Sequence, residues 1–82
     1  MQTTKPHLPP LAEYADLQDV RKSIGRFPTD DSFRWFLRIN RQRLVDSGAM
    51  ILVAGRQMFH PELVKQIIVE AGSAAAQRRT AA

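Results

Sequence analysis

The stretch FPTDDSFRWFLRINRQRL, Phe27–Leu44, decides the fold and raises the question of function. Pro28 disfavours a helical conformation for the residue before it, and Thr29 or Asp30 can accept the free amides of a new helix. The acidic pair Asp30 and Asp31 also suits the positive N-terminal end of a helix dipole. The stretch therefore predicts a helix that begins near residue 30, and it places four arginines and a tryptophan on that helix.

This helix is expected to run to about Ser47 and to end before Gly48, with two different faces. At 100° per residue, one side is apolar and is predicted to face the core; it holds Phe33, Leu37, Asn40 and Leu44, with Phe36 near its edge. A separate basic edge holds arginines at spacings of four and three: Arg34, Arg38 and Arg41. Arg43 points elsewhere.

The basic edge favours a polyanionic partner. Like charges at i and i+4 cost a few tenths of a kcal/mol in an isolated helix, and no acidic residue separates these arginines. A guanidinium group can fork onto a phosphate or a guanine edge. The alternative is a helix face that is simply solvated. Trp35 flanks the basic edge, and we expect it to pack on the protein or to lean on a sugar-phosphate rather than to stack on a base.

Composition restricts the class of protein. The 82 residues allow one domain at most, and they carry a net charge of +4 with a pI near 10.4. Residues 21–56 hold eight basic and three acidic side chains, a net +5. There is no cysteine, which excludes disulfides and thiolate metal sites. No apolar run approaches the roughly 18 residues of a membrane span, and the N-terminus has no signal-peptide core, so we predict a cytoplasmic protein without membrane contact.

The remaining elements follow from local signals. Residues 1–10 hold three prolines and are predicted to be a flexible arm, residues 11–73 the folded domain, and residues 74–82 a flexible tail or frayed helical extension. A first helix is expected from Leu11 or Asp16 to Ile24, with Gly25 as its stop. Two β-rich runs, residues 50–53 and 57–60, flank Ala54-Gly55-Arg56 and predict a tight hairpin of undecided turn type.

A third helix should begin at Pro61, with His60 as a possible cap, and end at Gly72. The order helix, turn, helix, hairpin, helix predicts a mainly α fold with a small β-hairpin, the winged helix-turn-helix. Arg56 and Gln57 would then lie on the wing, beside the basic helix, and give a second phosphate-contacting point on the same surface.

The segment from about Arg26 to Ile68 resembles the excisionase-like winged helices of phages and mobile elements, which are related to the MerR type. Phe33-Arg34-Trp35-Phe36 is similar to the Leu-Arg-Tyr-Tyr segment of that superfamily, and Leu-Val-x-x-Gly-Ala and a Gly-Arg turn follow it. The resemblance implies that Ser32, Arg34 and Arg38 face the major groove and that Arg56 acts from the wing. Asp30 and Asp31 depart from a purely basic helix start; one could accept from a cytosine amino group.

The predicted DNA-contacting set is Thr29, Ser32, Arg34, Trp35, Arg38, Arg41, Arg56 and Gln57. No metal-ligand spacing, phosphate loop or nucleophile-base arrangement occurs, so neither catalysis nor a cofactor nor a metal is expected.

The leading hypothesis, which rests on the resemblance, is an excisionase-type protein that bends DNA at an attachment site, self-associates on adjacent sites and biases an integrase toward excision. The first alternative is a winged-helix transcriptional regulator. The second is a protein-interaction domain whose arginines match an acidic surface.

Overall fold

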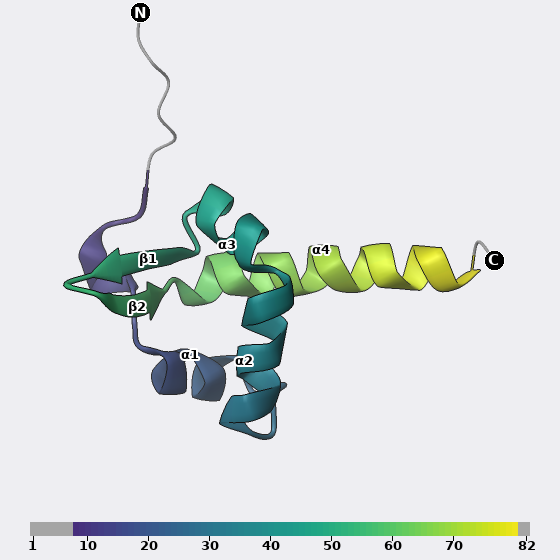
Figure 1. Ribbon diagram of the computed structural model, residues 1–82, viewed down its shortest axis with the longest axis horizontal. Coiled ribbons are helices and arrows are strands. Elements are labelled where there is room, and N and C mark those ends of the chain that lie inside the picture. Colours follow the sequence, from purple (N-terminus) through teal and green to yellow (C-terminus); the bar gives the residue numbers. More distant parts are fainter. Residues whose placement is uncertain (1–7, 81–82) are drawn as a thin grey trace, which may run out of the picture.

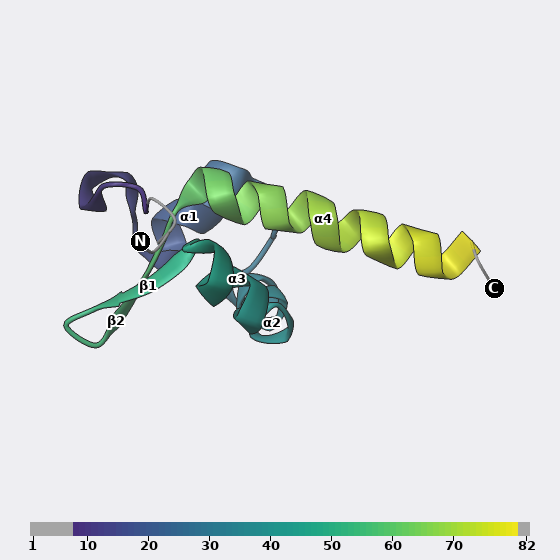
Figure 2. The same cartoon turned by 90° about the horizontal axis from the view of Figure 1, so that it is seen from above.

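The computed structural model describes residues 8–80, and these residues form a mainly helical domain with a two-stranded antiparallel hairpin. A short 3-10 turn, η1 (Leu11–Glu13), precedes helix α1 (Leu17–Ile24). Helices α2 (Asp30–Ile39) and α3 (Arg41–Ser47) lead into strands β1 (Met50–Val53) and β2 (Arg56–Phe59). Helix α4 (Pro61–Thr80) completes the fold, and it runs away from the end of the molecule that carries the hairpin (Figures 1 and 2).

The expected arm, residues 1–10, lies outside the described residues except for its last three positions, and residues 81 and 82 also lie outside them. Within residues 8–80, no helix has both the length and the apolar character needed to cross a membrane.

Local signals set both ends of α1, and of the two expected starts the helix takes the one at Asp16. The Asp16 carboxylate accepts the Asp19 amide hydrogen at 2.9 Å and caps the helix, so α1 begins after Asp16 and not at Leu11. Gly25 has a left-handed φ of 72° and ends the helix, which confirms the predicted stop.

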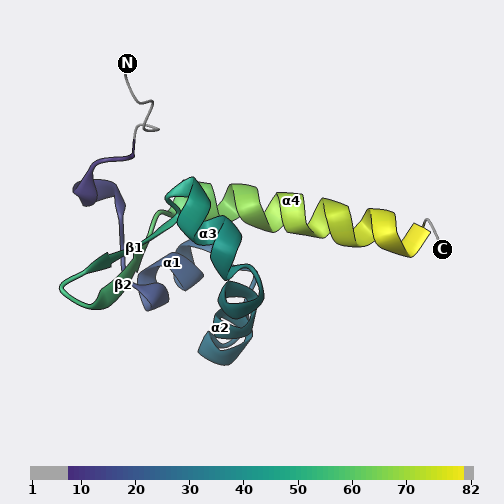
Figure 3. The same ribbon diagram turned by 45° about the horizontal axis from the view of Figure 1, so that its top comes forward.

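The helix predicted for residues 30–47 is two helices, and the prediction of one continuous helix is wrong. The backbone leaves helical geometry at Asn40, where φ is −113° and ψ is 20°. Both the amide and the side-chain Nδ2 of Asn40 donate to the Phe36 carbonyl, at 3.1 and 3.0 Å. An asparagine side chain that competes for a backbone carbonyl in this way favours a helix end. Figure 3 shows α3 leaving α2 at an angle.

The hydrophobic positions predicted to face the core are nevertheless buried, whereas Asn40, predicted on the same side, is only half-buried. Phe33 and Leu44 are completely inaccessible to solvent, and Leu37 and Phe36 nearly so. Phe33 lies at the centre of an aromatic cluster, with its ring centroid 5.0 Å from that of Phe27 and 6.2 Å from that of Phe59. These contacts join α2 to the preceding turn and to the hairpin. They complete a core with Val20, Ala49, Met50, Val64 and Ile67.

The hairpin turn consists of two residues, Ala54 and Gly55, with φ values of 51° and 81°. Positive φ at both central positions is the geometry of a type I′ turn, whose twist matches that of the strands. Arg56 was expected within the turn, but it is the first residue of β2 and pairs with Val53. The strand accordingly begins one residue earlier than predicted.

A third extended segment, not predicted, pairs with the hairpin. Ala15 and Phe59 exchange two backbone hydrogen bonds of 2.8 Å, and the Tyr14 hydroxyl donates to the Gly48 carbonyl at 2.6 Å. His60 is the predicted cap of α4, because its Nδ1 accepts the Leu63 amide hydrogen at 3.2 Å. In neutral His60 the ring proton is then on Nε2, which lies 2.8 Å from Glu13 Oε1. The N-terminal segment is thus fixed at three points.

Helix α4 does not end at Gly72, contrary to the prediction, and it is helical as far as Thr80. Gly72 has no positive φ, and a glycine in ordinary helical geometry costs only about 1 kcal/mol relative to alanine. The alanines on either side, Ala71 and residues 74–76, are strong helix formers and carry the helix through. Residues 74–80, expected to be either a flexible tail or a frayed helical extension, therefore form the projecting helical end of α4 (Figure 1).

Replacing Phe33 with alanine should lower the free energy of unfolding by about 3–5 kcal/mol, because the change leaves a cavity at the centre of the aromatic cluster. Urea unfolding followed by circular dichroism measures the loss. Trp35→Ala is the matched control: its side chain is on the same helix but is 59% exposed, so we expect a change within about 0.5 kcal/mol. Equal losses in the two variants would show that the inward face of α2 is assigned wrongly.

The single tyrosine of the chain should titrate at high pH. Burial, and secondarily the Glu13 charge, raise the pKa of Tyr14 above its ordinary value of about 10. The folded state therefore favours the neutral phenol, a contribution to stability that is complete below pH ~10 and is lost as pH rises through the folded pKa. The phenolate absorbance should appear at higher pH in the native chain than in the chain unfolded in urea. Coincident titrations would contradict the burial of this hydroxyl.

Candidate nucleic-acid interface

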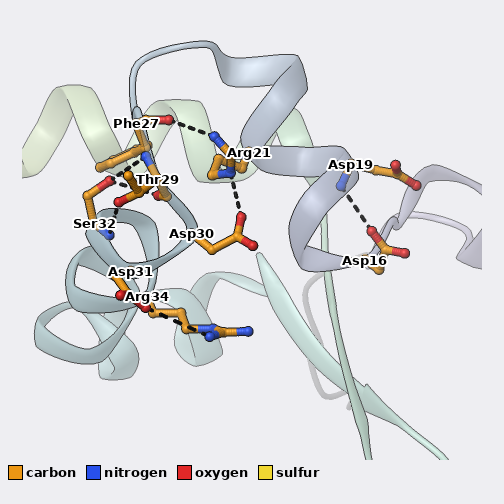
Figure 4. A network of polar contacts seen from close by, with 9 residues as sticks. All are labelled: Asp16, Asp19, Arg21, Phe27, Thr29, Asp30, Asp31, Ser32 and Arg34. Carbon is orange, nitrogen blue, oxygen red and sulfur yellow. Dashed lines mark hydrogen bonds and ion pairs between the residues drawn. The ribbon is translucent and has the colours of Figure 1, made fainter.

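The turn between α1 and α2 is held by Arg21, whose contacts were not predicted from the sequence. Arg21 Nε donates to Asp30 Oδ1 at 2.6 Å, and its Nη1 donates to the Phe27 carbonyl at 3.0 Å (Figure 4). Both partners are half-buried, so this ion pair orients the start of α2 relative to α1. Asp30 is thereby engaged within the protein.

Thr29 and Ser32 form a capping box at the start of α2. The Ser32 amide donates to Thr29 Oγ1 at 3.1 Å, and the Thr29 amide donates to Ser32 Oγ at 3.3 Å (Figure 4). Both hydroxyl oxygens thus accept hydrogen bonds from backbone amides that the start of a helix leaves without partners. Ser32 Oγ also lies 2.8 Å from the Thr29 carbonyl. Because both hydroxyls are hydrogen-bonded within the protein, the candidate interface consists mainly of the arginines that follow them.

Three predicted arginines lie together, although the helix that was expected to align them is broken. Arg34 and Arg38 extend from α2 and Arg41 from the start of α3, and all three line one open hollow. The floor of this hollow is apolar and is made by Leu17, Leu37 and Met50. The break at Asn40 changes the helix axis after Ile39 but leaves Arg41 beside its neighbours.

The hairpin strand forms the opposite wall of this surface. Gln57 of β2 lines the same hollow as the three arginines, and it also lines an adjoining hollow with Arg34, Arg56 and Gln18. Of the eight predicted residues, Arg34, Arg38, Arg41, Arg56 and Gln57 are therefore gathered on one surface. We call these five residues the arginine surface.

The electrostatics of the arginine surface are positive and open to solvent. Arg38, Arg41 and Arg56 are exposed, and none makes an ion pair within residues 8–80. Arg34 lies 4.0 Å from Asp31, but the two side chains are 60% and 95% exposed. An ion pair of this kind contributes little in water, so Arg34 is available to an anion.

Trp35 lines neither of these hollows. Of the two roles expected for it, packing on the protein is wrong, and contact with a sugar-phosphate stays a prediction. Its side chain is 59% exposed, next to Ile39 at 57%. The indole projects beside the arginines on the outer side of α2, because Phe36 and Leu37 occupy the inward side.

Sequence reasoning missed the contribution of α1. Asp16 and Gln18, at the start of that helix, line the adjoining hollow with Arg34 and Arg56. The cap residue Asp16 marks where the helix begins, but its position opposite the hairpin depends on the pairing of Ala15 with Phe59. No local pattern encodes that long-range pairing.

Comparison of the chain with protein-family models, with curated proteins and with solved structures finds no match.

Proposed function

We propose that this chain is a winged helix-turn-helix protein that binds double-stranded DNA through the arginine surface. The observation that carries the proposal is the shared hollow between α2 and β2, where Arg34, Arg38 and Arg41 face Gln57. Helix α2 would be the recognition helix and the hairpin the wing. An exposed helix edge with a second positive point on the neighbouring strand suits the phosphates that flank a groove.

The roles within the arginine surface follow from position. Arg38 is exposed in the last turn of α2, where it lines the shared hollow with Arg34 and Arg41, and it would reach a base edge. Arg56, on the hairpin, would contact the backbone. Thr29 and Ser32 would present the helix start to DNA while they cap it. Trp35 would lie against a sugar-phosphate, because it is exposed and lies about 60° around α2 from Arg38 at 100° per residue.

Within DNA binding, the excisionase type remains the leading candidate, on the resemblance of residues 26–68 to that family. The chain would bend DNA beside an attachment site and act with an integrase in the cytoplasm, without catalysis of its own. A module of this size buries about 600–1,000 Å² on DNA, which favours cooperative binding on adjacent sites over binding at a single site. The second candidate is a transcriptional regulator of a phage or mobile element.

Binding to duplex DNA should weaken steeply with salt, because neutralised phosphates release counterions. If Arg34, Arg41 and Arg56 contact phosphate while Arg38 reads a base, the logarithm of the association constant should fall with a slope of about −3 against the logarithm of salt concentration. Fluorescence anisotropy with a labelled duplex from the protein's own genetic locus measures the slope. A flat isotherm, or no binding at low salt, would sink the DNA proposal and favour the protein-interaction domain.

Arg38→Ala should reduce discrimination between target and random duplex by about 1–3 kcal/mol, as expected for a base-reading arginine. Arg56→Ala should weaken both duplexes to a similar extent and lower the salt slope by about 1. Arg43→Ala is the matched control, since Arg43 is an exposed arginine of α3 that does not line the arginine surface. Unchanged affinities for Arg38→Ala would mean that α2 is not the recognition helix.

The excisionase and regulator candidates differ in how protomers are arranged on DNA. Cooperative binding to direct tandem sites by a chain that is monomeric without DNA supports the excisionase type. A tight dimer in sedimentation, with a palindromic footprint, supports the regulator. An excision assay with the neighbouring integrase then tests the leading candidate directly.

A further inference from the structure

A second surface lies on the other side of α2, between the α2–α3 junction and the projecting half of α4. Its floor is apolar and is built by Phe36 and Ile39 from α2 and by Ile68, Ala71 and Ala75 from α4. Ile39 is 57% exposed although it lies beside the buried Phe36. We call this surface the α4 groove. It exists because α4 continues past Gly72, beyond the part of the helix that packs on the core (Figure 3).

The charges along the α4 groove have one sign. Arg43 of α3 and Arg78 of α4 line it, and no acidic side chain among the described residues does. Neither arginine makes an ion pair within residues 8–80. A ligand for the groove therefore needs an apolar surface for the floor and carboxylates for these two guanidinium groups.

The α4 groove is separate from the arginine surface. The residues that line the two surfaces do not overlap. At 100° per residue, Phe36 lies about 160° around α2 from Arg38. A molecule in the groove would thus leave the arginine surface open.

We propose that the α4 groove binds an acidic amphipathic helix of a partner protein. Two neighbouring helices with an apolar floor between them form the kind of groove into which such a helix lays its apolar face. DNA fits less well, because its backbone would cover Ile39 and Ile68 without burying apolar surface of its own. The proposal does not depend on DNA binding, since it rests on different residues.

The free face of α4 in a second copy of this chain is a poorer occupant than a separate protein. Within the part of the chain that the structure describes, Val69 is the large exposed apolar side chain of α4, with Glu62 and Glu70 near it on the same face. Lys65 lies on that face as well. One valine in a patch of mixed charge supplies neither the apolar area nor the negative charge that would match the groove.

The test uses the full chain and a synthetic peptide of about 18 residues, long enough to be helical in water, with leucines at i, i+4 and i+7 flanked by glutamates. Backbone amide shifts of isotope-labelled protein should change at Ile39, Ile68 and Ala75 as the peptide is added. A control peptide with lysine in place of glutamate should not bind. Shifts that map elsewhere, equal binding of both peptides, or no binding of the acidic peptide would overturn the proposal.

Variants assign the binding to the groove. The double change Arg43→Glu and Arg78→Glu should weaken the acidic peptide about tenfold, since it reverses both charges at the groove. Arg79→Glu, the next residue along α4 but outside the groove lining, is the matched control and should leave affinity unchanged. Ala75→Trp should block the groove, because its exposed side chain can grow without disturbing the core. Circular dichroism establishes that each variant is folded, and equal effects of the double change and Arg79→Glu would refute the assignment.

Two further measurements identify a wrong occupant. Sedimentation of the chain alone would show a dimer that Ala75→Trp abolishes if a second copy filled the groove, and this would overturn the proposal. If the double change weakened binding of duplex DNA as much as Arg38→Ala does, the groove would belong to a DNA-binding surface, and this result would also overturn the proposal. Failure of DNA binding with intact peptide binding would remove the proposed function and leave the groove as inferred.

Discussion

The buried ring of Phe33 positions the turn before α2, helix α2 itself and strand β2 relative to one another. Its fully buried ring contacts Phe27 in the turn before α2 and Phe59 at the end of β2, so one side chain sets both the direction of α2 and its distance from the hairpin. A domain of this length buries only about 60% of its unfolded surface, and few other contacts can take over that task. The next residue is Arg34. The packing that buries Phe33 therefore also turns Arg34 toward Gln57 on the neighbouring strand.

The positive character of the arginine surface results from how the acidic residues are used. Asp30 binds Arg21 and fixes the turn, Asp16 caps α1, and Asp46 accepts the Gln42 amide hydrogen at 2.8 Å. These carboxylates are occupied by local structure. Among the described residues, Arg38, Arg41 and Arg56 have no ion-pair partner, and Arg34 has only the exposed Asp31 at 4.0 Å. Exposed like charges repel one another only weakly in water at physiological salt, so the fold tolerates this uneven distribution. The attraction of this charge distribution for a polyanion would exceed the weak repulsion that it adds to the folded state.

Elements whose signals are local could be predicted from the sequence. Gly25 and Gly48 end helices with left-handed φ, His60 caps α4, and the inward face of α2 follows from helical periodicity. The features that were missed depend on competition or on distance. Asn40 fits a helical stripe equally well whether its side chain faces the core or binds the Phe36 carbonyl. The grouping of Arg34, Arg38 and Arg41 was expected from spacing alone, but the contribution of Gln18 depends on the pairing of Ala15 with Phe59, which no neighbouring residue encodes.

Helix α2 belongs to two surfaces at once, and this has a consequence for how they would work together. Arg38 and Phe36 are on nearly opposite sides of a helix that Phe33 and Leu37 fix to the core, so a ligand on one side has no flexible element through which to alter the other. Occupancy of the α4 groove would then leave intrinsic DNA affinity almost unchanged. If the partner that supplied the acidic helix also touched DNA, the two sites would instead reinforce each other through effective concentration. Cooperation in so small a domain would come from tethering two ligands to one rigid helix, and not from a change of conformation.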